Sequence, residues 1–469
     1  MNGAKALLKT LLDGGIEVCF TNPGTSEMHF VAALDQDERM HCVLGLFEGV
    51  VTGAADGYAR IKGKPAATLL HLGPGLGNGL ANLHNAKRGN VPMVNIIGDH
   101  ASYHLHLDSP LTSDVKAIAS TMSHWVRSSK HADDVAKDAA EAIAVASQKP
   151  GAIASLILPA DVSWNKTSHT SASPGVAAPA KAVPDSAVDN ALAILQSGEP
   201  TLLMMGGDLD RELLICAGQV AASTGARLGV ETFPPRLAHG AGVPSLEKLP
   251  YIPEFAADML KDLKHIILVG APRPVSFFAY PLLNSELHAE ACHVHQLAAQ
   301  DQDAADALER LAQKLGKTCD GPVNALAPPA LPVGPLSSTS IAQSIAAQLP
   351  ANAIVVDEGI VGGSEVFPNT ATAQPHDWII QTGGSIGWGL PAATGISKQF
   401  AHDVFHQRGL AGIADDVAVV RLQKPAQHSV ELALQPVLHK PHAFVCVRVA
   451  FDRAENMHQK GCRIVAGIY

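Results

Sequence analysis

Glu48 occupies the position in this sequence that is best suited to acid–base chemistry. The short apolar run Leu46-Phe47 leads directly into it, and the residues that follow, 49–60, are mostly small, as in a buried helix. The N-terminus of a helix favours an ionised carboxylate, whereas burial favours the neutral acid. We interpret Glu48 as a carboxyl group that shares a proton with a ligand nitrogen. The alternative is an acid that only caps the helix.

Two glycine-rich turns could bring backbone close to a ligand. They are Asn-Pro-Gly-Thr-Ser-Glu at 22–27 and His-Leu-Gly-Pro-Gly-Leu-Gly-Asn at 71–78, and each follows an expected strand. The carboxyl ends of parallel strands are where α/β sheets bind ligands, and a helix opening at Gly77 could bind an anion. Either turn alone is also compatible with a simple strand-to-helix connection. A dinucleotide fingerprint and a phosphate-binding loop with lysine are both missing, which disfavours those ligands.

Short apolar runs alternate with helical patterns along the first 400 residues, which predicts parallel sheets flanked by helices. Residues 165–184 and 322–336 are rich in Ala, Pro, Ser or Gly and read as linkers. The sequence therefore predicts an α/β protein of three domains, at 1–164, 185–321 and 337–469, the third being incomplete, with a divergent tail after about residue 396. The expected helices are 4–12, 77–86, 189–195 and 340–349; the expected strands are 16–20, 66–71, 92–97, 153–158, 201–205, 265–269 and 353–357.

Composition narrows the range of partners. The formal net charge is -10 without a basic cluster, so nucleic acid and anionic membranes are disfavoured. We expect a cytoplasmic protein, because we find neither a membrane-spanning run nor a signal peptide. The seven cysteines are scattered singly, and this spacing favours reduced thiols over disulfides or a zinc site.

Four ordered motifs resemble one enzyme family. They are the turn at 22–24, the segment from Glu48 through Ala-Asp-Gly-Tyr-Ala-Arg, the turn at 73–75, and Gly-Ser-Ile-Gly-Trp-Gly-Leu-Pro-Ala-Ala at 384–393. Together they are similar to the acetolactate synthase and benzoylformate decarboxylase group of thiamine-diphosphate enzymes, over residues 1–396. The resemblance implies that the chain forms or cleaves the bond beside the carbonyl of a small 2-keto acid, for example making 2-acetolactate and CO2 from two pyruvates.

The resemblance also implies roles for individual residues. The family glutamate matching Glu48 hydrogen-bonds the aminopyrimidine of the cofactor and promotes the tautomer that removes the thiazolium proton. The carbonyl matching Gly384 accepts from the aminopyrimidine amine, and the residue matching Ile386 props the cofactor in its bent shape, although an ordinary core residue is the alternative for Ile386. The remaining matched positions are cofactor-binding Pro23, Gly24 and Gly75, and substrate-binding Thr25 and His71.

Other expectations are less specific. A histidine after a strand is more often a packed or capping residue, so His71 keeps that alternative. Arg273 could meet a substrate carboxylate, although a surface arginine is the commoner case. Family analogy predicts thiamine diphosphate and Mg²⁺ as cofactors, and a homodimer or homotetramer in which each site lies between two chains. Flavin binding stays open, since the strand-end glycines at 206–207 and 270 are generic.

The resemblance stops after Gly395. Family members continue with Gly-Asp-Gly-Ser and a later Asn, whose oxygens bind the Mg²⁺ that holds the diphosphate. This chain has no Gly-Asp-Gly, and Asp415-Asp416 lacks flanking glycines, so we read it as a solvated turn and predict no metal ligands. Six scattered histidines in the tail have no metal-binding spacing. One hypothesis is that the tail comes from a shifted reading frame. The functional alternatives are thus an active 2-keto acid enzyme and an inactive paralogue or frame-disrupted product that acts through association with an intact subunit.

Overall fold

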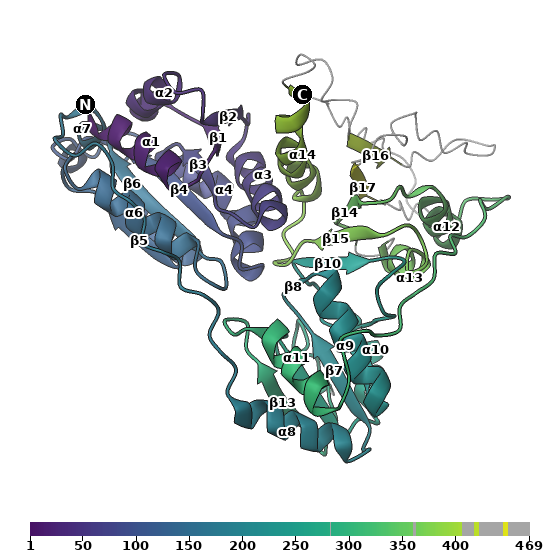
Figure 1. Ribbon diagram of the computed structural model, residues 1–469. Coiled ribbons are helices and arrows are strands. Elements are labelled where there is room, and N and C mark those ends of the chain that lie inside the picture. Colours follow the sequence, from purple (N-terminus) through teal and green to yellow (C-terminus); the bar gives the residue numbers. More distant parts are fainter. Residues whose placement is uncertain (282, 360–362, 406–416, 422–443, 449–469) are drawn as a thin grey trace.

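The computed structural model describes residues 1–281, 283–359, 363–405, 417–421 and 444–448. The chain forms three α/β units, each built on one sheet (Figure 1). The predicted α/β class is confirmed. In the part of the chain that is described, no helix has the length and apolar character required to cross a membrane.

The first unit contains a six-stranded parallel sheet in the order β2-β1-β3-β4-β6-β5. Its central strands are buried along their whole length, as expected for a sheet covered on both faces. The strands are β1 (Val18–Asn22), β2 (His41–Leu44), β3 (Ala66–Leu70), β4 (Met93–Asp99), β5 (Trp125–Ser128) and β6 (Ile153–Pro159). The helices are α1 (Gly3–Asp13), η1 (Thr25–Glu27), α2 (Met28–Leu34), α3 (Glu48–Lys62), α4 (Leu72–Arg88), η2 (Leu105–Leu107), α5 (Val115–Met122), α6 (Val135–Ala146) and α7 (Ala160–Trp164).

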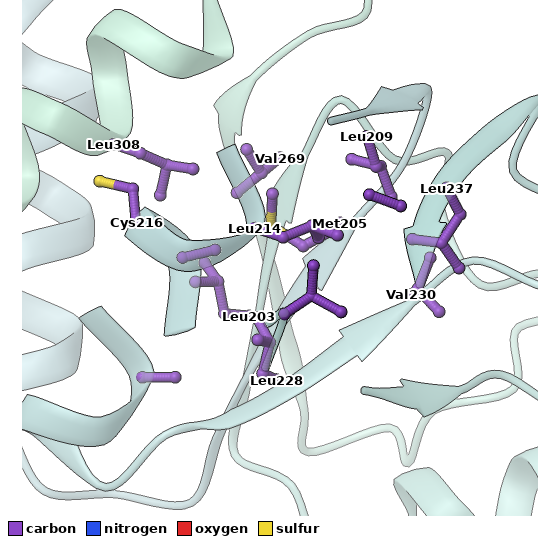
Figure 2. Close-up of a cluster of buried hydrophobic side chains, with 14 of the residues drawn as sticks. Leu203, Met205, Leu209, Leu214, Cys216, Leu228, Val230, Leu237, Val269 and Leu308 are labelled. Carbon is purple, nitrogen blue, oxygen red and sulfur yellow. The ribbon is translucent and has the colours of Figure 1, made fainter. Parts of the chain in front are cut away.

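The central unit has a five-stranded parallel sheet in the order β11-β9-β7-β12-β13. The strands are β7 (Thr201–Met205), β9 (Arg227–Val230), β11 (Glu247–Lys248), β12 (His265–Val269) and β13 (His293–Ala298). The helices are α8 (Asp185–Gln196), α9 (Arg211–Thr224), α10 (Pro253–Leu260) and α11 (Ala304–Lys314). Figure 2 shows part of its core, where Leu203 and Met205 of β7 lie near Leu214 of α9.

The third sheet is mixed, in the order β16-β17-β14-β15-β10-β8. Its strands are β8 (Asp208–Leu209), β10 (Arg236–His239), β14 (Ala353–Asp357), β15 (His376–Ile380), β16 (Val417–Arg421) and β17 (Phe444–Arg448). Its helices are α12 (Ser338–Gln348), η3 (Gly363–Glu365), α13 (Val366–Asn369) and α14 (Gly389–Phe405). β10 pairs antiparallel with β15 and parallel with β8. The segment that builds the central unit therefore also contributes two strands to one edge of this sheet.

Two details of the sequence analysis are wrong. The helix expected at 77–86 begins at Leu72, so Gly77 lies inside α4 and does not open it. Cys216 and Cys319 form a disulfide, although all cysteines were expected to be reduced. The two residues are 103 positions apart and meet because the chain passes α9 again after α11, a proximity that sequence spacing does not reveal.

Candidate active site

Glu48 is the first residue of α3 and is only 5% exposed. Its Oε2 accepts a hydrogen bond of 2.9 Å from the Asn78 side-chain amide on α4. Its Oε1 lies 2.7 Å from the place where a Cβ would stand at Gly75, so only glycine leaves room for the carboxyl group. Gly75 therefore shapes this half of the site by the absence of a side chain.

A second buried carboxyl group lies at the neighbouring strand end. Glu27 is 3% exposed and accepts hydrogen bonds from the Gly24 N–H and the Ser26 hydroxyl, both at 2.7 Å. His71 Nδ1 lies 2.8 Å from Glu27 Oε2. Donation from Nδ1–H to this carboxylate fixes the ring orientation and puts the lone pair on Nε2.

Glycines again make this packing possible. A Cβ at Gly24 would stand 2.2 Å from the His71 ring, and one at Gly98 would stand 1.6 Å from Glu27 Oε1. His71 keeps 23% of its side chain exposed, and its Cβ lies 3.1 Å from the position of a Cβ at Gly75. Glu48 and His71, the partner of Glu27, consequently both lie next to Gly75 near the start of α4.

The other first-domain candidates lie in the turn before η1. Pro23 and Gly24 are partly buried, whereas Thr25 is exposed. The turn thus reaches the surface beside His71. The roles assigned to Pro23, Gly24 and Thr25 stay predictions.

The third domain supplies Gly384 and Ile386 on a turn that leads into α14. Gly384 has φ +75°, a left-handed conformation that favours glycine, and nothing lies within 4 Å of the position of its Cβ. Ile386 is 67% exposed, so it is not a core residue of this chain. The core alternative is excluded, and an exposed isoleucine on a glycine turn is compatible with contact to a ligand.

Helices α3 and α14 pack tightly and join the first and third domains (Figure 1). A Cβ at Gly57 would stand 2.2 Å from the Ala392 carbonyl oxygen, and one at Gly395 would stand 1.8 Å from that of Ala54. Small residues therefore let the two backbones approach each other.

A buried ion pair reinforces this contact. Arg60 donates to both carboxylate oxygens of Asp56, at 2.6 and 2.9 Å, and Trp388 Nε1 donates to Asp56 at 2.6 Å. Arg60 also donates to the Ile380 carbonyl oxygen at 2.7 Å. These bonds connect α3 to the end of β15 and to the residue before α14.

No group of three or more His, Cys, Asp or Glu side chains within the described residues is arranged to hold a metal ion. The acids at the end of β14 are engaged, since Asp357 accepts from the Gly359 N–H and Glu358 accepts from the Trp388 N–H. Asp415-Asp416 lies outside the described residues, as do five of the six tail histidines: His406, His428, His439, His442 and His458. His402 lies within α14.

A carboxyl group lies at the strand ends of the central unit. Glu231 Oε1 accepts the Gly207 N–H at 2.8 Å and lies 2.6 Å from the position of a Cβ at Gly206. Burial raises the pKa of Glu231 to about 7. The Gly207 N–H is thus already paired within the chain. Arg273 forms an exposed ion pair with Glu286, which fits the surface interpretation of this arginine.

Sequence reasoning did not identify Glu27 or Asn78 as site residues. Both belong to the quoted turns, but a carboxylate or an amide in such a turn has no distinguishing spacing. Only the fold brings Glu27 to His71 and Asn78 to Glu48. A polar side chain at the end of each turn motif, Glu27 in one and Asn78 in the other, was the available sign.

Comparisons with known proteins identify relatives of this chain. Residues 1–124 match the family model described as "Thiamine pyrophosphate enzyme, N-terminal TPP binding domain". The "Putative acetolactate synthase large subunit IlvX" of Mycobacterium tuberculosis (strain ATCC 25618 / H37Rv) is 54% identical over 398 residues, covering 85% of this chain and 76% of that protein. Benzoylformate decarboxylase of Pseudomonas aeruginosa PAO1 is 29% identical over 412 residues, covering 81% and 75%.

Solved structures share the fold. The thiamine diphosphate-dependent 4-hydroxybenzoylformate decarboxylase of Rhodococcus jostii RHA1 superposes with a TM-score of 0.70 at 19% identity, over 85% of this chain and 79% of that one. Benzoylformate decarboxylase from Polynucleobacter necessarius gives 0.70 at 20% identity, over 86% and 79%. At these identities the likeness establishes the three-unit fold alone.

Proposed function

This chain belongs to the thiamine-diphosphate-dependent family of 2-keto acid decarboxylases and carboligases, and we propose that it binds thiamine diphosphate and acts on a small 2-keto acid. By analogy, the reaction joins two pyruvates into 2-acetolactate with loss of CO2. The observation that carries the proposal is the buried Glu48 carboxyl group, held by Asn78 over the side-chain-free Gly75.

Glu48 acts on the pyrimidine side of the site. When bound, thiamine diphosphate supplies the carbon that adds to the keto carbonyl and the ring that accepts electrons as CO2 leaves. Asn78 holds Oε2 of Glu48, so Oε1 is left to share a proton with a ring nitrogen.

His71 is placed to handle a proton on the substrate. Glu27 orients its ring through Nδ1, and Nε2 then either accepts a proton or, once protonated, donates one to a developing oxyanion. Because the ring is partly exposed beside the turn at Gly24, a substrate can reach it.

Two copies of the chain are needed to complete the site. Helix α4 contacts Glu48 through Asn78 and the turn at Gly383–Ser385 through Asn85, seven residues later. At 1.5 Å per residue these contacts are roughly 10 Å apart along the helix axis. One chain therefore carries two separate half-sites, which favours a homodimer or homotetramer.

The surfaces beside each half-site support association. Leu46 is 74% exposed and Phe47 50% exposed next to Glu48, and Ile386 is exposed on the other half. Large apolar side chains gathered at an incomplete site are typical of an interface.

The second candidate function is association without catalysis. It is favoured by the missing Gly-Asp-Gly after Gly395 and by the IlvX match, which covers 85% of this chain. In this case the chain is an inactive paralogue or a frame-disrupted product. If the reading frame shifted, another frame of the coding DNA spells Gly-Asp-Gly-Ser followed by a later Asn.

Calorimetric titration of the purified chain with thiamine diphosphate in excess Mg²⁺ separates the two candidates. Saturable binding that disappears with a chelator, followed by pyruvate or benzoylformate turnover, supports the enzyme. No binding at millimolar cofactor contradicts it and favours the associating subunit, which is then tested by mixing the chain with an intact relative.

A further inference from the structure

Asn85 is a buried residue of α4 that the chemistry proposed above does not use. It is completely buried, and its side-chain amide faces the turn that precedes α14. Oδ1 accepts hydrogen bonds from the Gly383 and Ser385 N–H groups, both at 3.1 Å. Nδ2 donates to the Ser385 carbonyl oxygen at 2.9 Å and to Asn82 Oδ1 at 3.1 Å.

Only an asparagine meets all of these demands. Its amide offers two acceptor lone pairs and two N–H donors, and here all four are used. Aspartate would keep the acceptors but would place a negative oxygen against two other oxygen atoms. A buried network that is only partly satisfied is costly, because each unpaired group loses its hydration without replacement.

The bonds of Asn85 lie on both sides of Gly384. Gly383 precedes it and Ser385 follows it, while the Thr382 hydroxyl donates to the Asn85 carbonyl oxygen at 2.6 Å. A Cβ at Gly383 would stand 2.8 Å from Asn85 Oδ1, so the close approach requires glycine there. Gly384 itself is exposed, and its conformation is fixed by its neighbours.

We propose that Asn85 is a positioning residue that shapes the Gly383–Ser385 turn so that Gly384 and Ile386 meet the aminopyrimidine of thiamine diphosphate. The inference rests on the proposed function, because Gly384 and Ile386 are assigned to the cofactor there. Asn85 touches neither cofactor nor substrate and acts through the backbone of the turn.

The test compares Asn85→Asp with Asn95→Asp in the full-length chain. Asn95 is equally buried, and it bonds Thr68 and Ser155 in the first sheet, away from the turn. The same chemical change is thus made at two buried sites of one domain. Gly383→Ala is a second variant that displaces the turn from its other side, in case Asn85→Asp does not fold.

Two measurements are made on each variant. Hydrogen–deuterium exchange followed by mass spectrometry reports on the peptide covering residues 381–389, and calorimetry gives the dissociation constant for thiamine diphosphate with Mg²⁺. Asn85→Asp and Gly383→Ala are expected to speed exchange in this peptide and weaken cofactor binding at least tenfold. Asn95→Asp is expected to lower the melting temperature without either effect.

The outcomes separate the inference from the proposed function. Unchanged exchange in Asn85→Asp overturns the inference, and so does faster exchange with an unchanged dissociation constant. Equal weakening in Asn95→Asp also overturns it, since a general loss of stability then explains the effect. If the unmodified chain binds no cofactor, the proposed function is wrong, and so is the cofactor role assigned to Gly384 and Ile386. Faster exchange in Asn85→Asp would then still establish that Asn85 shapes the turn.

Discussion

The first and third domains carry the two halves of the proposed site, and they hold them in different ways. In the first domain, Glu48 and Glu27 are fixed by partners from the same domain. In the third domain, the Gly383–Ser385 turn is fixed by Asn85, which belongs to the first. The pyrimidine half is therefore self-supporting, whereas the other half takes its shape from a neighbouring domain.

This difference changes what each motif says about function. A motif whose residues bond one another keeps its geometry as long as its own domain folds. The glycine turn before α14 keeps its geometry only if the first and third domains also pack correctly through α3 and α14. Resemblance in the turn is thus weaker support for cofactor binding than resemblance around Glu48.

The largest expected effect is on turnover, through Glu48 in the half of the site that the first domain supports by itself. Glu48→Gln keeps an oxygen for the Asn78 N–H but cannot exchange a proton, so 2-keto acid turnover is expected to fall about 10²–10⁴-fold. Steady-state assays with pyruvate measure it, with exposed Glu38→Gln as the control. Turnover that survives in Glu48→Gln would remove the central assignment of this site.

The next largest effect is expected on stability, at the α3–α14 contact that supports the third domain's half of the site. Arg60→Met leaves the buried Asp56 carboxylate without its main partner and should cost about 3–5 kcal/mol of unfolding free energy. Denaturant unfolding measures the loss. Arg39→Met breaks an exposed pair with Asp37 and should cost far less, because water screens that pair. Equal losses in the two variants would mean that the domain contact contributes little.

The central domain gives a contrasting carboxyl group with a single backbone donor. Burial raises the folded-state pKa of Glu231 from 4.5 to about 7. The folded state therefore holds this proton more tightly, so its contribution is present below about pH 4.5 and is lost as pH rises to 7.

Glu231→Gln keeps the acceptor for Gly207 and cannot ionise. It should be more stable than the unmodified chain by about 1–3 kcal/mol at pH 8 and similar to it at pH 4.5. Thermal unfolding across this pH range measures the difference. A constant difference between the two proteins at all pH values would contradict the assigned ionisation.

The sequence predicted the elements better than the contacts. Strands such as β7, β12 and β14 coincide with the apolar runs that predicted them. A strand that is buried on both faces has a continuous apolar sequence, which is easy to recognise. The start of α4 was misplaced by five residues, since the Gly-Pro-Gly that reads as a turn lies within the helix. Glycine there serves to make room for Glu48, a tertiary demand that local propensity does not express.

The site was predictable only in part for the same reason. Glu48 could be singled out because its local context, an acid opening a helix of small residues, is visible in the sequence. Asn85 could not, because its partners lie about 300 residues away in a different domain. The Cys216–Cys319 disulfide could not be predicted for the same reason, because its two cysteines lie 103 positions apart in the sequence.

The smallest expected effect tests whether the third domain unfolds together with the first. Ser337 caps α12 by accepting from the Ser340 N–H, and Ser337→Ala should cost about 1 kcal/mol, while Ser337→Asp keeps an acceptor and should cost less. Unfolding is followed by hydrogen exchange in both domains. Because the first domain holds its half of the site with its own residues, the alanine variant is expected to lower protection in α12 and not in the first domain; lower protection in both domains would contradict the comparison. If only α12 loses protection, the first domain is stable by itself and the dependence runs in one direction, from the third domain on the first.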